Sequence, residues 1–274
     1  TRYYIGPALQ CSNIYPAMYA KGFYDGLKES GEKEIMSLVR CAWAGSQKYG
    51  VLTWSGDIYS SFRAMREQLQ AGLNMGMAGI PWWTSDIGGF VGGNIEDEDF
   101  RELLVRWFAW GAFCPVFRMH GERSPWYERE QEFIDNVRQL TSGQDNEVWS
   151  FGEDNYEILK KYLFVRENMR PYIRECMRAA SETGAPVMRP LFFDFPEDKK
   201  CWETEDVYMF GPDVLVAPVM ELGARERTLY LPKGAEWKDA VSGKLYEGGR
   251  TVTVDAPLSV IPVFVRDGKD IKIF

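Results

Sequence analysis

Short apolar runs alternate with polar loops and helical patterns along the first two thirds of the chain. Runs typical of buried strands occupy residues 35–39, 49–54, 77–83 and 115–119. Apolar residues at helical spacing follow the second run, behind Ser60 or Ser61 as N-cap, and follow the third run, behind an acidic first turn. The repetition of strand, loop and helix predicts parallel βα units.

Two further helices are predicted, one before these βα units in the chain and one after them. The first is predicted after Asn13 as N-cap, with Pro16 in its first turn, and it carries an apolar stripe every four residues: Tyr15, Tyr19, Phe23 and Leu27. The second begins near Glu153, and we expect Pro171 to kink it and Gly184 to end it.

The number of predicted βα units is too small for this chain to form a complete barrel. About eight βα units close a barrel, and this chain has room for half that number. The stretch of about 121–152 has no sustained period and is interpreted as a long loop insertion. After Pro186 the pattern changes to short strands split by Gly, Pro and Asp, predicted over 187–195, 207–210, 214–219, 227–231, 251–254 and 260–265. We therefore predict an α/β domain over 1–185 and a β domain over 186–274.

Composition and net charge exclude some kinds of binding partner. The 274 residues are 45% hydrophobic and 26% charged, with a net charge of -8. An acidic chain repels nucleic acid and anionic lipid, and no run approaches the roughly 20 apolar residues of a membrane span. Five scattered cysteines suggest neither a disulfide framework nor a zinc site. The first residues do not form a signal peptide, so we expect a cytoplasmic protein without nucleic-acid or membrane partners.

Polar residues follow each predicted strand of the first domain. Arg40, Asp57, Asp86 and His120 stand at the four successive strand ends. In parallel βα folds this is the face where ligands bind, so the four side chains are candidates for one shared pocket. Signatures of phosphate binding, zinc proteolysis and serine hydrolysis are missing from the sequence.

Each candidate also has an ordinary structural explanation. Asp57 lies on a Gly-containing turn after Trp54, whose indole is a surface suited to stacking on a sugar ring, so a catalytic carboxyl is one interpretation. A helix cap or a turn residue is the more common role of an aspartate at such a position. Asp86 precedes a Gly-Gly pair and suits a turn as well. Arg40 suits a buried ion pair, and His120 suits a structural imidazole.

Several ordered blocks together resemble glycoside hydrolase family 31, the α-glucosidase and α-xylosidase family. The blocks span nearly the whole chain: RCAWAGSQ at 40–47, WSGD at 54–57, GIPWWTSDIGGF at 79–90, RW at 106–107 with RMH at 118–120, MRPL at 188–191, and YMFGP at 208–212 with LVAPV at 215–219. The resemblance implies the second half of a (β/α)8 TIM barrel followed by a β-sandwich domain.

The resemblance also implies a retaining exo-α-glycosidase in which Asp57 is the catalytic acid/base. Such chemistry uses two carboxyl groups and neither a metal nor a cofactor. The family's nucleophile is an aspartate after strand four, which precedes every block seen here. We therefore expect the missing N-terminal half of the same enzyme, in the same chain or as a second chain, as a partner.

The remaining site residues take binding roles by the same resemblance. Arg40 and His120 are expected to bind hydroxyls of the sugar, and Trp54 and Phe90 to line its subsite. Asp86 is expected to help order the site.

The substrate implied is an α-linked oligosaccharide or other α-glycoside with terminal glucose or xylose, between which the sequence does not choose. A non-catalytic carbohydrate-binding piece, or an inactive fragment of such an enzyme, is an alternative because the nucleophile is not in this sequence. An α-transglycosylase is the other alternative, because it forms the same covalent intermediate.

Overall fold

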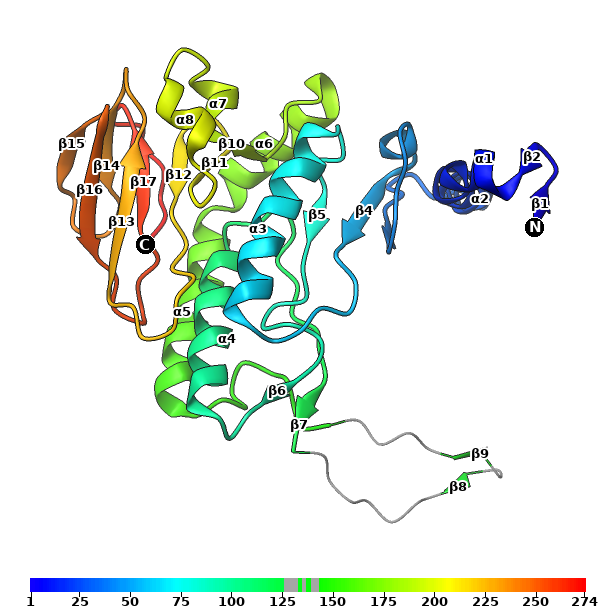
Figure 1. Ribbon diagram of the computed structural model, residues 1–274, viewed down its shortest axis with the longest axis horizontal. Helices are drawn as coiled ribbons and strands as arrows, with labels where there is room; N and C mark the ends of the chain where they lie inside the picture. Colours follow the sequence, from blue (N-terminus) through cyan, green and yellow to red (C-terminus); the bar gives the residue numbers. More distant parts are fainter. Residues whose placement is uncertain (126–132, 135–136, 139–142) are drawn as a thin grey trace.

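The computed structural model describes residues 1–125, 133–134, 137–138 and 143–274, and it contains a parallel sheet where the sequence predicts one (Figure 1). Strands β3 (Ser37–Val39), β4 (Val51–Trp54) and β5 (Trp83–Thr84) lie in the order β3-β4-β5. Neighbours in the sheet are therefore neighbours in the sequence, as in a βα barrel.

Helices α3 (Phe62–Met77) and α4 (Glu98–Gly111) follow β4 and β5. The predicted cap is confirmed for Ser61, whose hydroxyl accepts a hydrogen bond from the N–H of Ala64 at 3.1 Å. Asp97 caps α4, and two acidic residues occupy the first turn as predicted. Trp107 and Trp110 of α4 are fully buried in the core.

Two predicted strands are shorter than expected. The prediction over 77–83 is wrong for most of its length, because α3 runs to Met77 with Leu73 and Gly76 still buried against the core. The prediction over 115–119 is also wrong as a regular strand. Its position beside β5 is kept by a hydrogen bond from the N–H of Val116 to the carbonyl of Trp83 at 3.3 Å and by a parallel bridge between Met119 and Ile87.

The physical reason for this irregular segment is a competing hydrogen-bond donor. Arg166 donates to the carbonyls of Ala112, Cys114 and Pro115 at 2.6–2.9 Å. Pro115 has no N–H of its own, so this end of the segment has neither the donor nor the free acceptor that a strand ladder needs.

The N-terminal elements lie at the opposite end of the molecule from the β domain (Figure 1). They are β1 (Arg2–Tyr3), β2 (Gly6–Pro7), α1 (Ala8–Cys11) and α2 (Tyr15–Glu29). The predicted cap at Asn13 is wrong, because Asn13 lies in a short 3-10 helix, Ser12–Ile14, and makes no capping bond. The apolar stripe is real but uncovered: the exposed fractions are Tyr15 56%, Tyr19 50%, Phe23 52% and Leu27 37%.

The long helix predicted from Glu153 is two helices. Helix α5 (Glu153–Asn168) and helix α6 (Arg170–Thr183) meet at Met169, with Pro171 in the first turn of α6. Gly184 ends α6 with a φ of 77°, a left-handed conformation that favours glycine. The predicted stop at Gly184 is therefore confirmed, and the kink predicted at Pro171 is instead a complete break at Met169, two residues earlier.

The predicted loop insertion over 121–152 lies partly outside the described residues. Within it, β7 (Arg123–Ser124) pairs in parallel with β6 (Gly93–Asn94). Strands β8 (Phe133–Ile134) and β9 (Val137–Arg138) form an antiparallel pair.

The C-terminal part is a β-sandwich. One antiparallel sheet has six strands in the order β10-β11-β12-β17-β14-β15, and β13 pairs with β16 in the other. Side chains from both sheets form one core, including Leu215, Trp237 and Phe264 from the first and Leu229 and Val254 from the second. The strand bounds are β10 (Met188–Pro190), β11 (Tyr208–Phe210), β12 (Val214–Val216), β13 (Glu226–Leu231), β14 (Glu236–Asp239), β15 (Leu245–Glu247), β16 (Arg250–Asp255) and β17 (Val263–Arg266).

Parts of this domain differ from the sequence prediction. The run over 187–195 is a strand only to Pro190, after which Leu191–Asp194 form the short helix α7. Helix α8 (Lys199–Glu203) and strands β14 and β15 were not predicted. Only Trp237 is buried in β14 and no residue of β15 is, so an alternating apolar pattern is weak there.

The barrel part and the β-sandwich share a hydrophobic core. Buried residues of β10, β11, β12 and β17 pack in the same cluster as those of α3, α4, α5 and α6. The predicted boundary at 185/186 falls between α6 and β10 and stays a prediction. None of the described helices combines the length and the apolar character needed to cross a bilayer.

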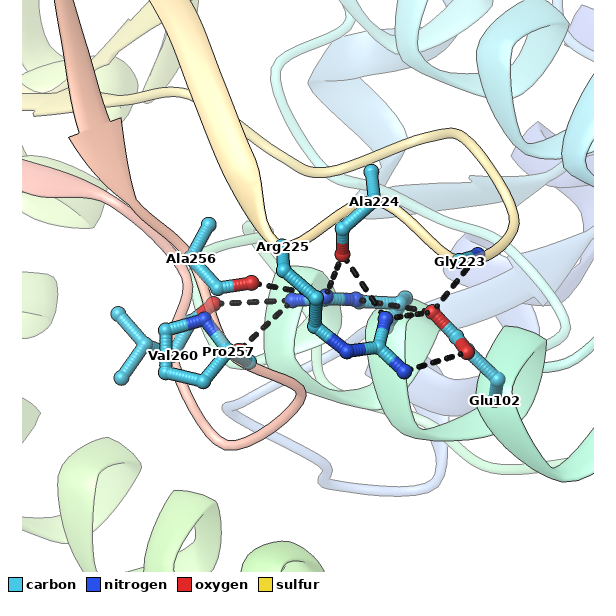
Figure 2. Close-up of polar contacts among 8 residues, drawn as sticks. Glu102, Gly223, Ala224, Arg225, Ala256, Pro257 and Val260 are labelled. Atoms are coloured by element: carbon cyan, nitrogen blue, oxygen red, sulfur yellow. Dashed lines mark hydrogen bonds and ion pairs between the residues drawn. The ribbon is translucent and has the colours of Figure 1, made fainter.

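Arg106 of α4 connects the two parts, and Figure 2 labels the residues around its side chain, Glu102 of α4 and Ala224, Ala256, Pro257 and Val260 of the β domain. Its side chain is 2% exposed and lies 3.8 Å from Glu102, which also accepts two hydrogen bonds from Arg225. Burial lowers the pKa of Arg106 to about 10, which still leaves the guanidinium charged at neutral pH. The Arg106 guanidinium donates at 2.6–3.1 Å to four backbone carbonyls of the β domain, those of Ala224, Ala256, Pro257 and Val260.

We predict that Arg106→Met lowers the free energy of unfolding by about 3 kcal/mol, because four buried carbonyls lose their donor. Denaturant titration measures the loss. Arg63→Met is the control, since Arg63 is 84% exposed and its only ion-pair partner among the described residues is Glu67 on the same helix surface. Equal, small losses in both variants would show that Arg106 does not hold the two parts together.

Candidate active site

Asp57 lies on a tight turn directly after β4. Gly56 has a φ of 81° and is buried, and the N–H of Ile58 donates to its carbonyl at 3.0 Å. The Asp57 side chain itself is 46% exposed. Because Ser61 caps α3, the alternative that Asp57 is a helix cap is excluded.

Arg40 and Asp57 come from neighbouring strand ends and face one another. Nη2 of Arg40 lies 3.5 Å from Oδ2 of Asp57, and the two side chains are 65% and 46% exposed. An exposed pair of this kind contributes only about 0–1 kcal/mol to stability. The alternative of a buried ion pair for Arg40 is therefore wrong, and both groups are accessible to a ligand.

Asp86, unlike Asp57, lies in a buried environment. Its side chain is fully buried, with Oδ1 paired to Nη1 of Arg118 and Oδ2 without a hydrogen-bond partner among the described residues. Burial raises the pKa of Asp86 above its usual value, whereas the Arg118 hydrogen bond and charge act to lower it. The charges of His120 and Asp57 also act on Asp86, which places the three groups in one electrostatic neighbourhood.

Aromatic rings complete this end of the sheet. The rings of Phe90 and His120 lie with centroids 5.3 Å apart at 39°. Trp54 is the last residue of β4, and the guanidinium carbon of Arg118 lies 6.0 Å from its ring centroid. His120 is exposed and Phe90 partly exposed, so the imidazole is not a buried structural one.

Backbone hydrogen bonds connect the loops that carry these side chains. The N–H of Phe90 donates to the carbonyl of Ile58 at 2.7 Å, and the N–H of Ser60 donates to the carbonyl of Val91 at 2.8 Å. The N–H of Glu122 donates to the carbonyl of Phe90 at 2.8 Å. The loops after β4, after β5 and after His120 are therefore tied together through the segment at Phe90.

Arg123 supports the same loop and was not predicted from the sequence. Its side chain is fully buried and donates to the carbonyls of Gly89 and Ile87 at 2.9 and 3.0 Å, and to the side chain of Asn146 at 2.8 Å. Burial lowers the pKa of Arg123 to about 10. No sequence pattern marked this role, because it depends on carbonyls brought together only by the fold.

The structure thus brings Arg40 together with Asp57, His120 with Phe90, and Asp86 with Trp54 through Arg118. Arg118 is the other residue to which the sequence assigned no role. Among the described residues, no group of three or more His, Cys, Asp or Glu side chains is arranged to hold a metal ion. The catalytic and binding roles of these residues stay predictions.

Comparison with known protein families places this chain among the glycosyl hydrolases that have a TIM-barrel domain. The model of the glycosyl hydrolases family 31 TIM-barrel domain matches residues 6–175, and the model of the glycosyl hydrolase family 31 C-terminal domain matches residues 184–271. The chain therefore belongs to glycosyl hydrolase family 31, which confirms the resemblance and the predicted fold class.

Individual relatives carry the names of α-glycosidases. An α-xylosidase of Saccharolobus solfataricus is 36% identical over 96% of this chain and 33% of its own length. Alpha-glucosidase 2 of Bacillus thermoamyloliquefaciens is 34% identical over 95% of this chain and 30% of its own length. A crystal structure of a family 31 α-xylosidase from a soil metagenome, complexed with xylose, is 57% identical with a TM-score of 0.95, over 98% of this chain and 40% of that one. The chain spans about a third of the length of these curated relatives.

Gly89 and Gly92 provide a matched test of the tied loops. Both have positive φ, 80° and 86°, so an alanine at either carries the same backbone penalty of about 1–2 kcal/mol. A Cβ at Gly89 would lie 2.6 Å from backbone atoms of Ser60, whereas one at Gly92 meets nothing within 4 Å. We predict that Gly89→Ala lowers the free energy of unfolding by about 2 kcal/mol more than Gly92→Ala in denaturant titrations. Equal losses would contradict close contact between the two loops.

Proposed function

We propose that this chain supplies the acid/base half of the site of a retaining exo-α-glycosidase. The proposal rests on the position of Asp57 and on its polar contacts. Asp57 stands at the carboxyl end of a parallel strand, takes no part in capping α3, and has the exposed Arg40 as its partner. Among the described residues, the only polar contact of its carboxyl group is this exposed pair, so the group is available to protonate a glycosidic oxygen on this face of a barrel.

The reaction requires a second carboxylate about 5–5.5 Å away, which attacks the anomeric carbon while Asp57 protonates the leaving oxygen. Water then releases the sugar, with Asp57 accepting its proton. Asp86 does not suit the role of nucleophile, because it is fully buried and paired with Arg118. The proposal therefore assigns the nucleophile to the other half of the barrel.

The exposed apolar surface at the N-terminal end supports such a partner. Besides the stripe on α2, the side chains of Ile5, Tyr4 and Leu9 are 59%, 105% and 103% exposed. Apolar surface of this extent is rarely left in contact with water. The proposed occupant is the N-terminal half of the same enzyme, which would also cover the free edge of β3.

The other strand-end residues suit a pyranose ring. Arg40 and His120 are exposed donors for sugar hydroxyls, and Trp54 and Phe90 present apolar surface to a ring face. The buried Asp86 fits an ordering role rather than direct contact.

Terminal α-linked xylose is the preferred substrate in this proposal, with α-linked glucose as the alternative. The support is the 57% identical xylose complex and the Saccharolobus relative named as an α-xylosidase. A subsite shaped for xylose rejects the extra hydroxymethyl group of glucose by bulk, which is worth about 1–3 kcal/mol.

In the complete enzyme, Asp57→Asn is predicted to reduce kcat/KM about 10²- to 10⁴-fold for substrates with poor leaving groups. Activated aryl glycosides, which need no proton for departure, should lose far less. Initial rates on an α-linked disaccharide and on a nitrophenyl glycoside of the same sugar measure the contrast. Asp270→Asn, at an exposed position near the C-terminus, should leave both rates unchanged. Equal losses on the two substrates would contradict the acid role.

Substrate preference is tested on the unmodified complete enzyme. We predict that kcat/KM for a nitrophenyl α-xyloside exceeds that for the matching α-glucoside by about 10- to 100-fold. A preference for the glucoside would overturn the xyloside assignment and leave the α-glycosidase proposal intact.

A further inference from the structure

Arg118 lies on the segment that follows α4, two residues before His120. Met119, between them, forms the bridge to Ile87 and packs against the core. His120, on the other side of Met119, packs its ring beside Phe90 with the centroids 5.3 Å apart, so Arg118 is close in the chain to the residues at this end of the sheet.

The Arg118 side chain contacts two groups at once. Its guanidinium pairs with the fully buried Asp86 and lies 6.0 Å from the ring centroid of Trp54. This is the outer limit of the range in which a cation is attracted to an indole face. Arg118 itself is 23% exposed, so it is held by these contacts at the border between the core and the site.

From this juxtaposition we propose that Arg118 is a positioning residue, anchored by Asp86, that fixes the orientation of the Trp54 indole beside the acid/base residue Asp57. The inference rests on the proposed function. Trp54 is three residues before Asp57 on the same strand end, so a rotation of the indole changes the wall of the sugar subsite next to the proton donor.

The chemistry of the pair suits this position. A planar guanidinium binds a carboxylate with one edge while its face lies against an aromatic ring, which a lysine ammonium does not do. An unpaired cation here would also repel the positive charge that develops on the sugar in the transition state. The Asp86 carboxylate neutralises Arg118 and removes that repulsion.

A double-mutant cycle in the complete enzyme tests the coupling. Arg118→Met should reduce kcat/KM about 10- to 100-fold, because the indole is no longer held in its productive orientation. In a Trp54→Phe background, the same substitution should cause less than about a threefold further loss, because the residue through which Arg118 acts is already gone. Arg118→Lys, which keeps the charge next to Asp86 but not the planar contact, should recover only part of the activity.

Arg101→Met is the matched control. Arg101 is 30% exposed, pairs with Glu98 on α4 and donates to the carbonyl of Ile95. It resembles Arg118 in exposure, but its carboxylate partner Glu98 is 91% exposed, and it makes no contact with Trp54 or Asp86. This variant should keep kcat/KM within about twofold, and thermal unfolding should show that all variants fold. Losses from Arg118→Met that are equal in the wild-type and Trp54→Phe backgrounds would overturn the proposal.

The same cycle is run on xylose affinity by calorimetry, which separates this inference from the proposed function. If the complete enzyme binds xylose without cleaving any α-glycoside, the proposed function fails, and coupling in the affinities still supports Arg118 as the positioning residue. If the enzyme cleaves α-xylosides but the two substitutions are additive, the proposed function stands and the positioning role is wrong. If it neither binds nor cleaves, both are overturned.

Discussion

Buried and half-buried arginine side chains that donate to backbone carbonyls are the interaction on which the rest of this structure depends. Arg106, Arg123 and Arg166 each satisfy at least three loop carbonyls that have left regular secondary structure. Burial lowers the pKa of each guanidinium to about 10, yet each stays charged at neutral pH. The desolvation cost is offset by charge-assisted hydrogen bonds that fix the loops in place.

This arrangement separates the residues that hold the site from those that are free to act. Arg123 fixes the loop before Phe90, and the buried Asp86 holds Arg118 against Trp54. Asp57 and Arg40, in contrast, are exposed, and the contact between them is a weak ion pair. A buried frame with accessible charged groups at its surface is the arrangement that the proposed function requires.

Sequence reasoning was most successful where local signals were strong. The cap at Ser61, the interruption of the helix near Pro171 and the strands at 227–231 and 251–254 depend on neighbours in the chain, and the structure contains each of them. The carboxyl-end rule for parallel strands also placed Arg40 beside Asp57. Prediction from the sequence failed where long-range contacts decide the outcome. At 115–119, Arg166 occupies the carbonyl of Pro115, an acceptor that a strand would need.

In the candidate site, too, local sequence signals identified some residues, and long-range contacts determine the roles of others. Asp57, Asp86 and His120 could be named because each follows an apolar run, whereas Arg118 and Arg123 act through partners more than 30 residues away in the sequence. The sequence also did not distinguish the exposed Asp57 from the buried Asp86, although their environments suit opposite tasks. Only the packing of the loop after β5 under the segment that carries Arg118 separates them.

The central claim is that Asp57 faces the leaving oxygen of an α-glycoside bound at the carboxyl ends of these strands. A crystal structure of the complete enzyme with xylose bound tests it most directly. We expect the anomeric hydroxyl to lie within about 2.6–3.2 Å of the Asp57 carboxyl group. Xylose bound at the strand ends with its anomeric hydroxyl turned away from Asp57, out of reach even through one water, would contradict the claim.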